Sequence, residues 1–334
     1  MSKDVKPFVV KTDANMDMLR HVQEELDAIA RSFTTPDDSE STLIDHVPDA
    51  DVLVTCYAPV TRKIIEAGKN LKGIVMWGVG YDHIDLAAAG EHGIPVVNCP
   101  NYGSQTVADH AFALLLNPAR RVGELDREMR KSGWLWPYRK YMGTDVHGKT
   151  IGIIGLGKTG TAMAQRCVGF GMEILVYDPY VEKIPEDLKQ AGFASLEKIF
   201  EKSDFISVHC NLTGETENMI DASLLVRLKP SAFIINVARG RVIEEPALVD
   251  ALKNGKIAGA GLDVFSEEPL PADHPFLSME NVILTPHLAY FTREADIRLD
   301  KECLQAIKDI LAGNPLPSLV DLSNPTMPTS DIFD

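Results

Sequence analysis

A glycine-rich motif directly after an apolar segment constrains the fold of this chain more than any other sequence feature. Residues 150–154 are apolar and rich in isoleucine, and Gly155, Gly157 and Gly160 follow with Gly-x-Gly-x-x-Gly spacing at the start of a helical segment. The first glycine permits a tight strand-to-helix turn, the second a close approach to a phosphate, and the third close packing of helix on strand. Because a helix N-terminus attracts anions, the motif predicts a unit that binds a dinucleotide.

An acidic residue after the next apolar segment indicates which dinucleotide this is. Residues 173–177 end at Asp178, which lies 18 residues beyond Gly160. A carboxylate at about that distance accepts hydrogen bonds from the adenosine ribose and repels a 2′-phosphate. We therefore expect NAD rather than NADP. The alternative is a glycine turn without a ligand, with Asp178 beginning a turn before Pro179.

Short apolar segments alternate with helical segments along the whole chain, which predicts an α/β protein with parallel sheets. The length of 334 residues suggests about two domains. A long helix, 106–121, separates two series of strands. The first series has strands at 8–10, 51–55, 71–77 and 94–97, with helices at 16–30, 61–67 and 84–92; the second has strands at 150–154, 173–177, 205–208, 232–237, 257–262 and 282–285.

Composition excludes several classes of protein. The chain has 33 basic and 48 acidic residues and a net charge of −15, which disfavours nucleic acid and anionic membranes as partners. No apolar run approaches the about 18 residues of a membrane span. Five scattered cysteines indicate reduced thiols, so we expect a cytoplasmic protein. No histidines or cysteines lie at metal-ligand spacing, so we expect no metal.

Three side chains of types that commonly serve in catalysis follow strands of the second series. Arg239 comes after the strand at 232–237, Glu268 lies in the loop after 257–262, and His287 follows 282–285. Alone, each has an ordinary interpretation, as a surface cation, a solvated turn or a structural histidine. Together they stand where open α/β sheets bind their ligands, at the carboxyl ends of strands.

The order and spacing of six segments resemble those of the D-isomer-specific 2-hydroxyacid dehydrogenases. The resemblance runs from about residue 50 to 315. The segments are Gly78-Val79-Gly80-Tyr81-Asp82-His83-Ile84-Asp85, Val107-Ala108-Asp109-His110, Gly155 to Gly160, Asn236-Val237-Ala238-Arg239-Gly240, Gly261-Leu262-Asp263-Val264-Phe265 to Pro269, and Thr285-Pro286-His287.

This resemblance implies two Rossmann-like or flavodoxin-like, doubly wound parallel-sheet domains with the active site in the cleft between them. Residues 1–103 and 290–334 would form a discontinuous substrate domain, and residues 104–289 an NAD-binding domain. The aromatic segment from Trp134 to Tyr141 would contact a second subunit, which implies a homodimer.

The reaction that the resemblance implies is the interconversion of a 2-oxo acid and its D-2-hydroxy acid. Hydride comes from the nicotinamide, and a proton comes from an acid that titrates near neutrality, for which histidine is suited. His287 would be that acid, with Glu268 orienting its ring and stabilising its protonated form. Arg239 would bind the substrate carboxylate and carbonyl oxygen.

The resemblance implies the remaining site residues as well. The substrate carboxylate would be bound by the backbone N–H groups of Val79 and Gly80 together with Arg239, and Asp263 would face the nicotinamide carboxamide. The residues expected along the cofactor are Gly155, Gly157, Lys158, Thr159, Gly160, Asp178, Cys210, Val237, Ala238 and Asp263.

The sequence leaves the identity of the substrate open. We favour a small 2-oxo acid such as glyoxylate, hydroxypyruvate or pyruvate. The alternatives are 3-phosphoglycerate or a related phosphorylated acid, and an NAD-sensing protein of the corepressor type. Three departures from the family pattern bear on this choice: Trp77 is either a wall around a small substrate or core packing, Asn117-Pro118 is either a substrate determinant or a tolerated change, and Asn211 replaces a usual proline near the cofactor.

Overall fold

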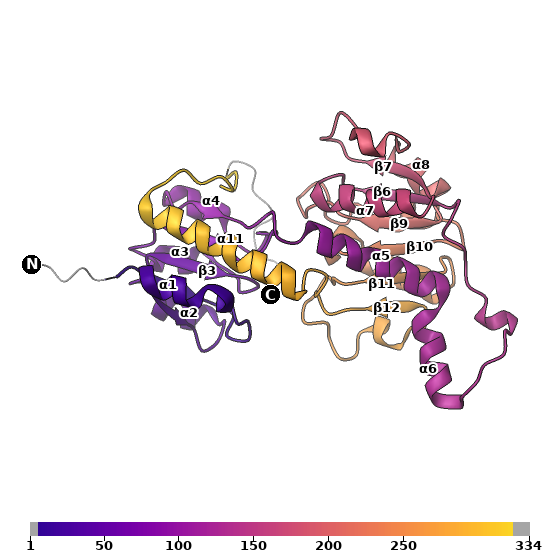
Figure 1. The fold of residues 1–334 in the computed structure, drawn as a ribbon, viewed down its shortest axis with the longest axis horizontal. Coiled ribbons are helices and arrows are strands. Elements are labelled where there is room, and N and C mark those ends of the chain that lie inside the picture. Colours follow the sequence, from indigo (N-terminus) through magenta and orange to yellow (C-terminus); the bar gives the residue numbers. More distant parts are fainter. Residues whose placement is uncertain (1–5, 323–334) are drawn as a thin grey trace, which may run out of the picture. The chain divides into compact units, whose positions relative to one another are not determined.

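The structure, a computed structural model, describes residues 6–322. These residues divide into two compact units. Unit 1 comprises the part of the chain up to Gly103 together with the part from Thr292, and unit 2 comprises Ser104–Phe291. Figure 1 shows that both units are built around a parallel sheet, so the fold class expected from the sequence is confirmed.

Unit 1 contains a five-stranded sheet with the order β2-β1-β3-β4-β5, in which every pairing is parallel. Every residue of β3 and β4 is buried, because helices cover both faces of the sheet. The helix α11 packs so closely over β4 that a Cβ on Gly73 would lie 2.7 Å from Ile310. The strands are β1 (Phe8–Lys11), β2 (Arg31–Thr34), β3 (Val52–Thr55), β4 (Gly73–Met76) and β5 (Val96–Val97), and the helices are α1 (Gln23–Ile29), α2 (Glu40–His46), α3 (Arg62–Ala67), α4 (Leu86–Glu91) and α11 (Arg293–Ala312).

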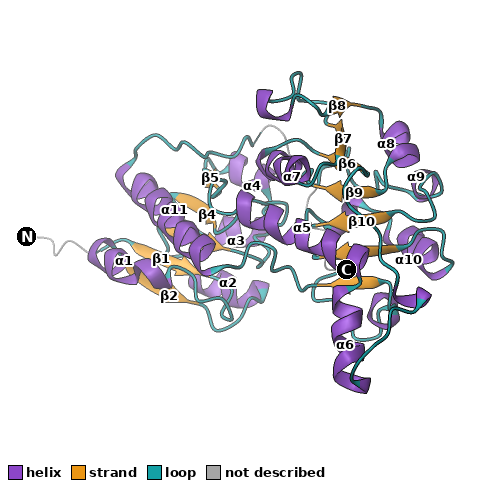
Figure 2. Ribbon diagram, turned by 45° about the vertical axis from the view of Figure 1, so that its right-hand side comes forward, coloured by secondary structure: helices purple, strands orange, loops and turns teal. Residues whose placement is uncertain are grey.

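Unit 2 contains a seven-stranded parallel sheet with the order β12-β11-β10-β9-β6-β7-β8, sandwiched between helices (Figure 2). The direction of winding reverses between β6 and β9, which is the point where doubly wound sheets bind dinucleotides. The strands are β6 (Thr150–Ile154), β7 (Glu173–Tyr177), β8 (Gly192–Phe193), β9 (Phe205–Val208), β10 (Phe233–Asn236), β11 (Gly259–Leu262) and β12 (Val282–Leu284), and the helices are α5 (Ser104–Arg120), α6 (Val122–Ser132), α7 (Lys158–Gly169), α8 (Leu196–Lys202), α9 (Ala222–Leu225) and α10 (Glu245–Lys253).

Some elements differ from the sequence expectation. The helix expected over 16–30 is wrong in its first half, because Leu19 adopts a left-handed conformation and α1 begins only at Gln23. The short strand β2 was not expected, since it lies at the sheet edge and half of its residues are exposed. The helix expected to end at Arg121 ends at Arg120, and α6 follows at once.

Candidate active site

The glycine turn after β6 has the geometry that its spacing predicts. Gly155 has φ +90°, and a Cβ there would lie 2.6 Å from the backbone nitrogen of Cys210, directly after β9. A Cβ on Gly160 would lie 1.9 Å from the carbonyl oxygen of Gly155. In contrast, a Cβ on Gly157 would meet no atom within 4 Å, so the backbone at this position borders open space. The turn therefore fits a dinucleotide. Gly155 and Gly160 allow close packing, and Gly157 leaves room at the N-terminus of α7, where Lys158 and Thr159 lie.

Asp178 closes the same turn from the end of β7. One carboxylate oxygen accepts a hydrogen bond from the N–H of Leu156 at 2.7 Å, and the other accepts from the N–H of Tyr180 at 2.9 Å. Asp178 thus orders the glycine turn and places a negative charge beside it. The predicted contact with the ribose is compatible with this position, because a carboxylate has further lone pairs to accept with.

The loop after β9 also borders the glycine turn. Cys210 is half-buried, and desolvation raises the pKa of its thiol to about 12, so the thiol stays neutral. Asn211 is exposed, and its backbone carbonyl accepts a hydrogen bond from Thr216 Oγ1 at 2.6 Å. This contact holds the turn at the position where the dehydrogenases that the sequence resembles usually have a proline.

A buried asparagine shapes the loop that carries Arg239. Asn236 Nδ2 donates to the Arg239 carbonyl at 2.8 Å, and Asn236 Oδ1 accepts from the Ala238 N–H at 3.0 Å. Val237, which follows Asn236 in the sequence, is buried. A Cβ on Gly240 would lie 1.9 Å from the carbonyl carbon of Phe265, so this loop packs directly on the next one, which leads to Glu268.

The structure brings Glu268 and His287 together. Glu268 Oε2 lies 2.6 Å from His287 Nδ1, and both side chains are about one quarter exposed, at 29% and 25%. Glu268 Oε1 accepts from the N–H of Phe265 at 2.8 Å, which fixes the carboxylate. Because a carboxylate only accepts hydrogen bonds, Nδ1 carries a proton in this pair. The other ring nitrogen, Nε2, is then the atom that can exchange a proton with a substrate.

Asp263 accepts hydrogen bonds from the loop that carries His287 and so holds this loop in place. Its side chain is only 1% exposed, and its oxygens accept from the N–H groups of Leu288 at 3.0 Å and Ala289 at 2.8 Å. Its backbone carbonyl accepts the N–H of His287 at 2.7 Å. These bonds hold His287 in a left-handed conformation, with φ 52°. The expected contact of Asp263 with the cofactor stays a prediction.

Two further residues complete this support, and the sequence interpretation gave neither of them a role. Thr285 Oγ1 donates to Asp263 Oδ1 at 2.5 Å, and His110 Nε2 lies 2.9 Å from the same hydroxyl. His110 comes from α5, so this helix is tied to the end of β12. His110 and Thr285 belong to two of the segments that carry the family resemblance, and this was the only signal for them.

In unit 1, the loop after β4 presents two backbone N–H groups. The carbonyl of Gly78 accepts from the Cys99 N–H at 2.8 Å, and the carbonyl of Val79 accepts from Asn98 Nδ2 at 2.8 Å. In a trans peptide the N–H points opposite to the carbonyl. The N–H groups of Val79 and Gly80 therefore point away from the bonds that anchor the loop, as a site for a carboxylate requires.

Of the two alternatives for Asn117-Pro118, the structure favours a tolerated change over a substrate determinant. These residues line a cavity of about 370 Å³ together with Phe233 and Asn281. Phe233 begins β10 and Asn281 precedes β12, so the cavity lies at the amino ends of strands whose carboxyl ends carry Arg239 and His287. Asn117 instead has a local structural role, because its Oδ1 accepts the N–H of Gly123 at 2.8 Å, in the first turn of α6.

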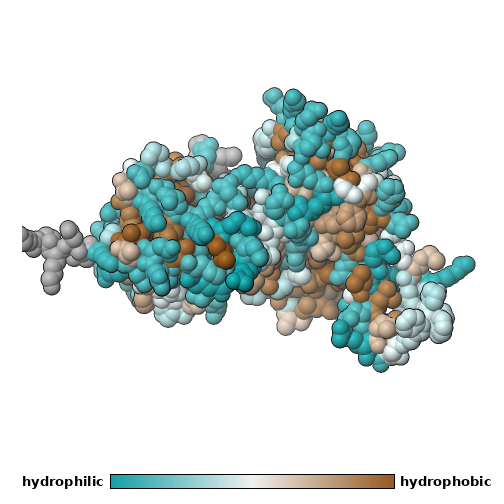
Figure 3. Space-filling view, in the orientation of Figure 1, coloured by the Kyte–Doolittle hydropathy of each residue, from teal (hydrophilic) through white to brown (hydrophobic). Residues whose placement is uncertain are grey.

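An exposed aromatic segment follows α6. Trp134 and Trp136 are 73% and 64% exposed, and α6 itself buries no residue. Figure 3 shows apolar residues gathered on this side of unit 2, over α5 and the beginning of α6.

Among residues 6–322, no helix is long and apolar enough to cross a membrane, and no group of three or more histidine, cysteine or acidic side chains is placed to hold a metal ion.

Comparison with known proteins decides the family. Residues 112–289 match the family described as "D-isomer specific 2-hydroxyacid dehydrogenase, NAD binding domain". The chain belongs to the D-isomer specific 2-hydroxyacid dehydrogenases. The resemblance inferred from sequence is thus confirmed, and so are the classification as an NAD-dependent oxidoreductase and NAD as the cofactor.

Several members of this dehydrogenase family are similar over most of the chain. The glyoxylate reductase of Korarchaeum cryptofilum is 42% identical over 85% of this chain and 86% of its own length. The D-3-phosphoglycerate dehydrogenase of Synechocystis sp. is 40% identical over 85% of this chain, which spans only 51% of that enzyme. A structure of D-lactate dehydrogenase from Aquifex aeolicus with NAD and lactic acid has a TM-score of 0.83 at 29% identity, covering 92% of this chain and 96% of that one.

Proposed function

We propose that this dehydrogenase reduces a small 2-oxo acid, such as glyoxylate, hydroxypyruvate or pyruvate, to its D-2-hydroxy acid. The observation that carries the proposal is the 2.6 Å contact between Glu268 and His287 Nδ1, in loops at the carboxyl edge of the sheet that bears the glycine turn. In this pair His287 is the proton donor, and Glu268 orients its ring. The pair lies at the edge where α/β sheets bind ligands.

Each protein group has one task in the proposed reaction. Bound NADH supplies hydride to the carbonyl carbon. His287 donates the proton on Nε2 to the carbonyl oxygen, while Glu268 holds Nδ1 and stabilises the charge of the ring. Arg239 forms paired hydrogen bonds with the substrate, which fixes the carbonyl and stabilises the negative charge that develops on its oxygen. In the opposite direction His287 acts as the base.

We assign the substrate carboxylate to the N–H groups of Val79 and Gly80. Their direction away from the anchored carbonyls supports this role. Backbone donors suit a carboxylate because they are already fixed in place before the anion binds. The glyoxylate reductase of Korarchaeum cryptofilum, which matches over nearly its whole length, favours a small acid. The similarity to D-3-phosphoglycerate dehydrogenases makes a phosphorylated hydroxy acid the second candidate.

Initial rates with a panel of acids test the proposal. NADH oxidation is measured with glyoxylate, hydroxypyruvate and pyruvate, and NAD reduction with 3-phosphoglycerate. We expect the highest kcat/KM with one of the three small oxo acids. Highest activity with 3-phosphoglycerate would replace our substrate by the second candidate, and no turnover with any acid would favour an NAD-sensing protein.

The charge of Asp178 is expected to set the preference for NADH. A like charge beside the 2′-phosphate of NADPH costs several kcal/mol, so we expect kcat/KM to favour NADH by about 100-fold. The variant Asp178→Ser removes the charge, and the preference should fall at least tenfold. The control Asp250→Ser removes an exposed carboxylate on α10 and should keep the parental preference. Equal use of both cofactors by the parent would contradict this role of Asp178.

We also propose a homodimer formed through α6 and the aromatic segment, in a cytoplasmic protein. A helix without a buried residue gains little stability from its own chain. The double variant Trp134→Ser/Trp136→Ser should sediment as a monomer, whereas the parent should sediment as a dimer. Tyr180→Ser is the control, because Tyr180 is 77% exposed on unit 2 but lies outside this segment. A monomeric parent, or a dimeric double variant, would disprove the proposed interface.

A further inference from the structure

Trp77 occupies the position directly before the Gly78–Gly80 loop, at the end of β4. Its side chain is only 2% exposed, and its indole Nε1 donates a hydrogen bond of 2.9 Å to Asp300 Oδ1. Its backbone N–H donates to the carbonyl of Thr55 at 2.8 Å. The indole thus packs inside unit 1. Of the two roles considered for Trp77, this supports core packing over a wall around the substrate. The indole also makes a directed hydrogen bond to the carboxylate of Asp300.

Asp300 is a fully buried carboxylate on α11. Besides the indole, it accepts the N–H groups of Leu19 and His21, each at 2.9 Å. Burial raises the pKa of Asp300, and its three hydrogen bonds oppose this effect. Leu19 adopts a left-handed conformation, φ 66°, and its N–H and that of His21 meet the two oxygens of the same carboxylate. Burying an aspartate is costly unless it is hydrogen-bonded, and Leu19, His21 and Trp77, all in unit 1, supply donors to this carboxylate.

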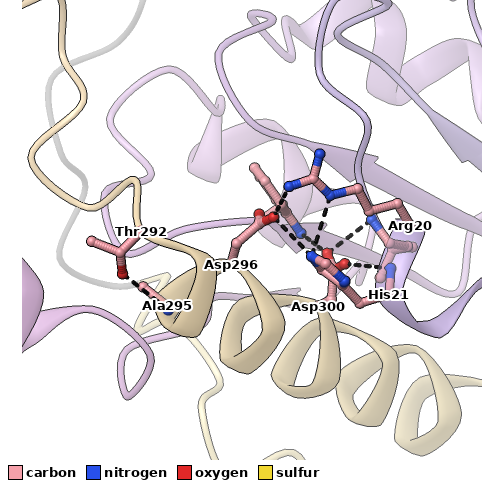
Figure 4. A network of polar contacts seen from close by, with 8 residues as sticks. Arg20, His21, Thr292, Ala295, Asp296 and Asp300 are labelled. Carbon is pink, nitrogen blue, oxygen red and sulfur yellow. Dashed lines mark hydrogen bonds and ion pairs between the residues drawn. The ribbon is translucent and has the colours of Figure 1, made fainter.

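A second aspartate fixes α11 one turn earlier. Figure 4 shows Asp296 and Asp300 side by side on the helix, facing Arg20 and His21. Asp296 pairs with the Arg20 guanidinium, and its Oδ2 lies 3.0 Å from His21 Nε2. The hydroxyl of Thr292 accepts the N–H of Ala295 and caps the helix. The N-terminal half of α11 is therefore held at several points and provides a rigid support for the indole.

The conformation of the Gly78–Gly80 loop depends on the position of Trp77, the residue before it. The carbonyls of Gly78 and Val79 are anchored to Cys99 and Asn98, and the Trp77 indole fixes the residue just before them. A peptide plane that rotates by a few tens of degrees would redirect the N–H on its opposite side. The direction of the Val79 and Gly80 N–H groups is thus set by contacts on both sides of the loop.

We propose that Asp300 and Trp77 are positioning residues for the substrate carboxylate, with α11 holding the indole and the indole holding the Gly78–Gly80 loop in its binding conformation. This inference rests on the proposed function, because it assigns the Val79 and Gly80 N–H groups to the substrate. Neither residue takes part in proton or hydride transfer. Their loss should therefore weaken binding of the acid in its ground and transition states alike, which raises KM and leaves kcat nearly unchanged.

The variant Trp77→Phe removes the indole N–H and keeps a ring in the core. We expect KM for the 2-oxo acid to rise about tenfold, with kcat within threefold of the parent and KM for NADH unchanged. Ile64→Val is the control, because Ile64 is a fully buried core residue of unit 1 on α3. It should lower the melting temperature without changing KM. An unchanged KM for the acid in Trp77→Phe, or an equal rise in Ile64→Val, would overturn the proposal.

A double-mutant cycle separates positioning from general destabilisation. If Asp300 acts on the substrate through Trp77, the double variant Trp77→Phe/Asp300→Asn should have a KM no more than about twice that of the worse single variant. Multiplication of the two single effects would mean that the residues act independently, and would overturn the proposal.

Hydrogen exchange tests the loop without reference to catalysis. In the parent without ligands, a peptide spanning residues 77–81 should exchange at least tenfold more slowly than in Trp77→Phe, and Ile64→Val should match the parent. If the parent turned over no acid, the proposed function would fail, and this measurement would still decide whether Trp77 orders the loop. Equal exchange in Trp77→Phe and the parent would overturn the inference even if the enzyme reduced glyoxylate.

Discussion

Replacing His287 by glutamine is expected to lower kcat for reduction of the 2-oxo acid by about 1000-fold, because general acid catalysis contributes about 10²–10⁴-fold. Glutamine can still donate a hydrogen bond to the carbonyl oxygen, but it cannot transfer a proton at neutral pH. The cofactor contacts that we expect lie around the glycine turn after β6, so binding of NADH should remain. Stopped-flow measurement of NADH oxidation in a single turnover gives the rate of the chemical step directly.

The matched variant is Glu268→Gln, which keeps the shape of the partner and removes its charge. We expect a smaller loss, of about 10–100-fold, because the neutral amide still contacts Nδ1 but no longer stabilises a charged ring. Retention of more than a tenth of the parental rate by His287→Gln would contradict its role as the acid. A larger loss in Glu268→Gln than in His287→Gln would move the principal role to the carboxylate.

The second large effect concerns stability in acid. His209 follows β9 and is partly buried, and desolvation lowers its pKa from 6.5 to about 3. Its Nε2 lies 2.8 Å from Ser207 Oγ, and its Nδ1 is buried without a hydrogen-bond partner. A protonated ring would place an N–H with no acceptor at Nδ1. The unfolded chain takes up this proton at about pH 6.5, whereas the folded chain does not until about pH 3.

The unfolded state therefore binds more protons than the folded state throughout this interval, so the free energy of unfolding decreases as the pH falls from 6.5 toward 3. One pKa unit corresponds to about 1.4 kcal/mol, and the contribution lost between pH 6.5 and pH 4 is about 3 kcal/mol. The variant His209→Gln keeps a polar partner for Ser207 and does not titrate. Denaturant titrations from pH 8 to pH 4 should give a difference in unfolding free energy, parent minus variant, that falls by about that amount. A difference that stays constant with pH would contradict the assignment.

Local patterns in the sequence were sufficient for most of the fold. The apolar segments of both series became parallel strands, and the glycine spacing after 150–154 gave the turn between β6 and α7. Periodicity failed where a residue departs from its usual backbone conformation, as Leu19 does four residues before α1 begins. It also failed for β2, whose half-exposed residues lack the apolar run of a central strand.

The candidate site was less accessible from sequence, because its geometry depends on contacts between distant residues. Order and spacing pointed to Glu268 and His287, but the support of the histidine loop by Asp263, Thr285 and His110 joins α5 to two strands. The contact between Trp77 and Asp300 spans 223 positions, so no local pattern could reveal it. The two alternatives for Asn117-Pro118 stayed open for the same reason, since only the structure places these residues near the amino ends of β10 and β12.

The two aspartates of α11 have a consequence for the order in which the chain folds during its synthesis. The strand β1 comes early in unit 1, but the acceptors for the N–H groups of Leu19 and His21 and for the Trp77 indole come from Asp300, in α11. Ile307 and Ile310 of the same helix are also core residues. The ribosome must release all of unit 2 before α11 emerges, so unit 2 can complete its fold while unit 1 still lacks a wall of its core. Unit 1, whose first strands are made before unit 2, thus completes its core only after unit 2 has been made.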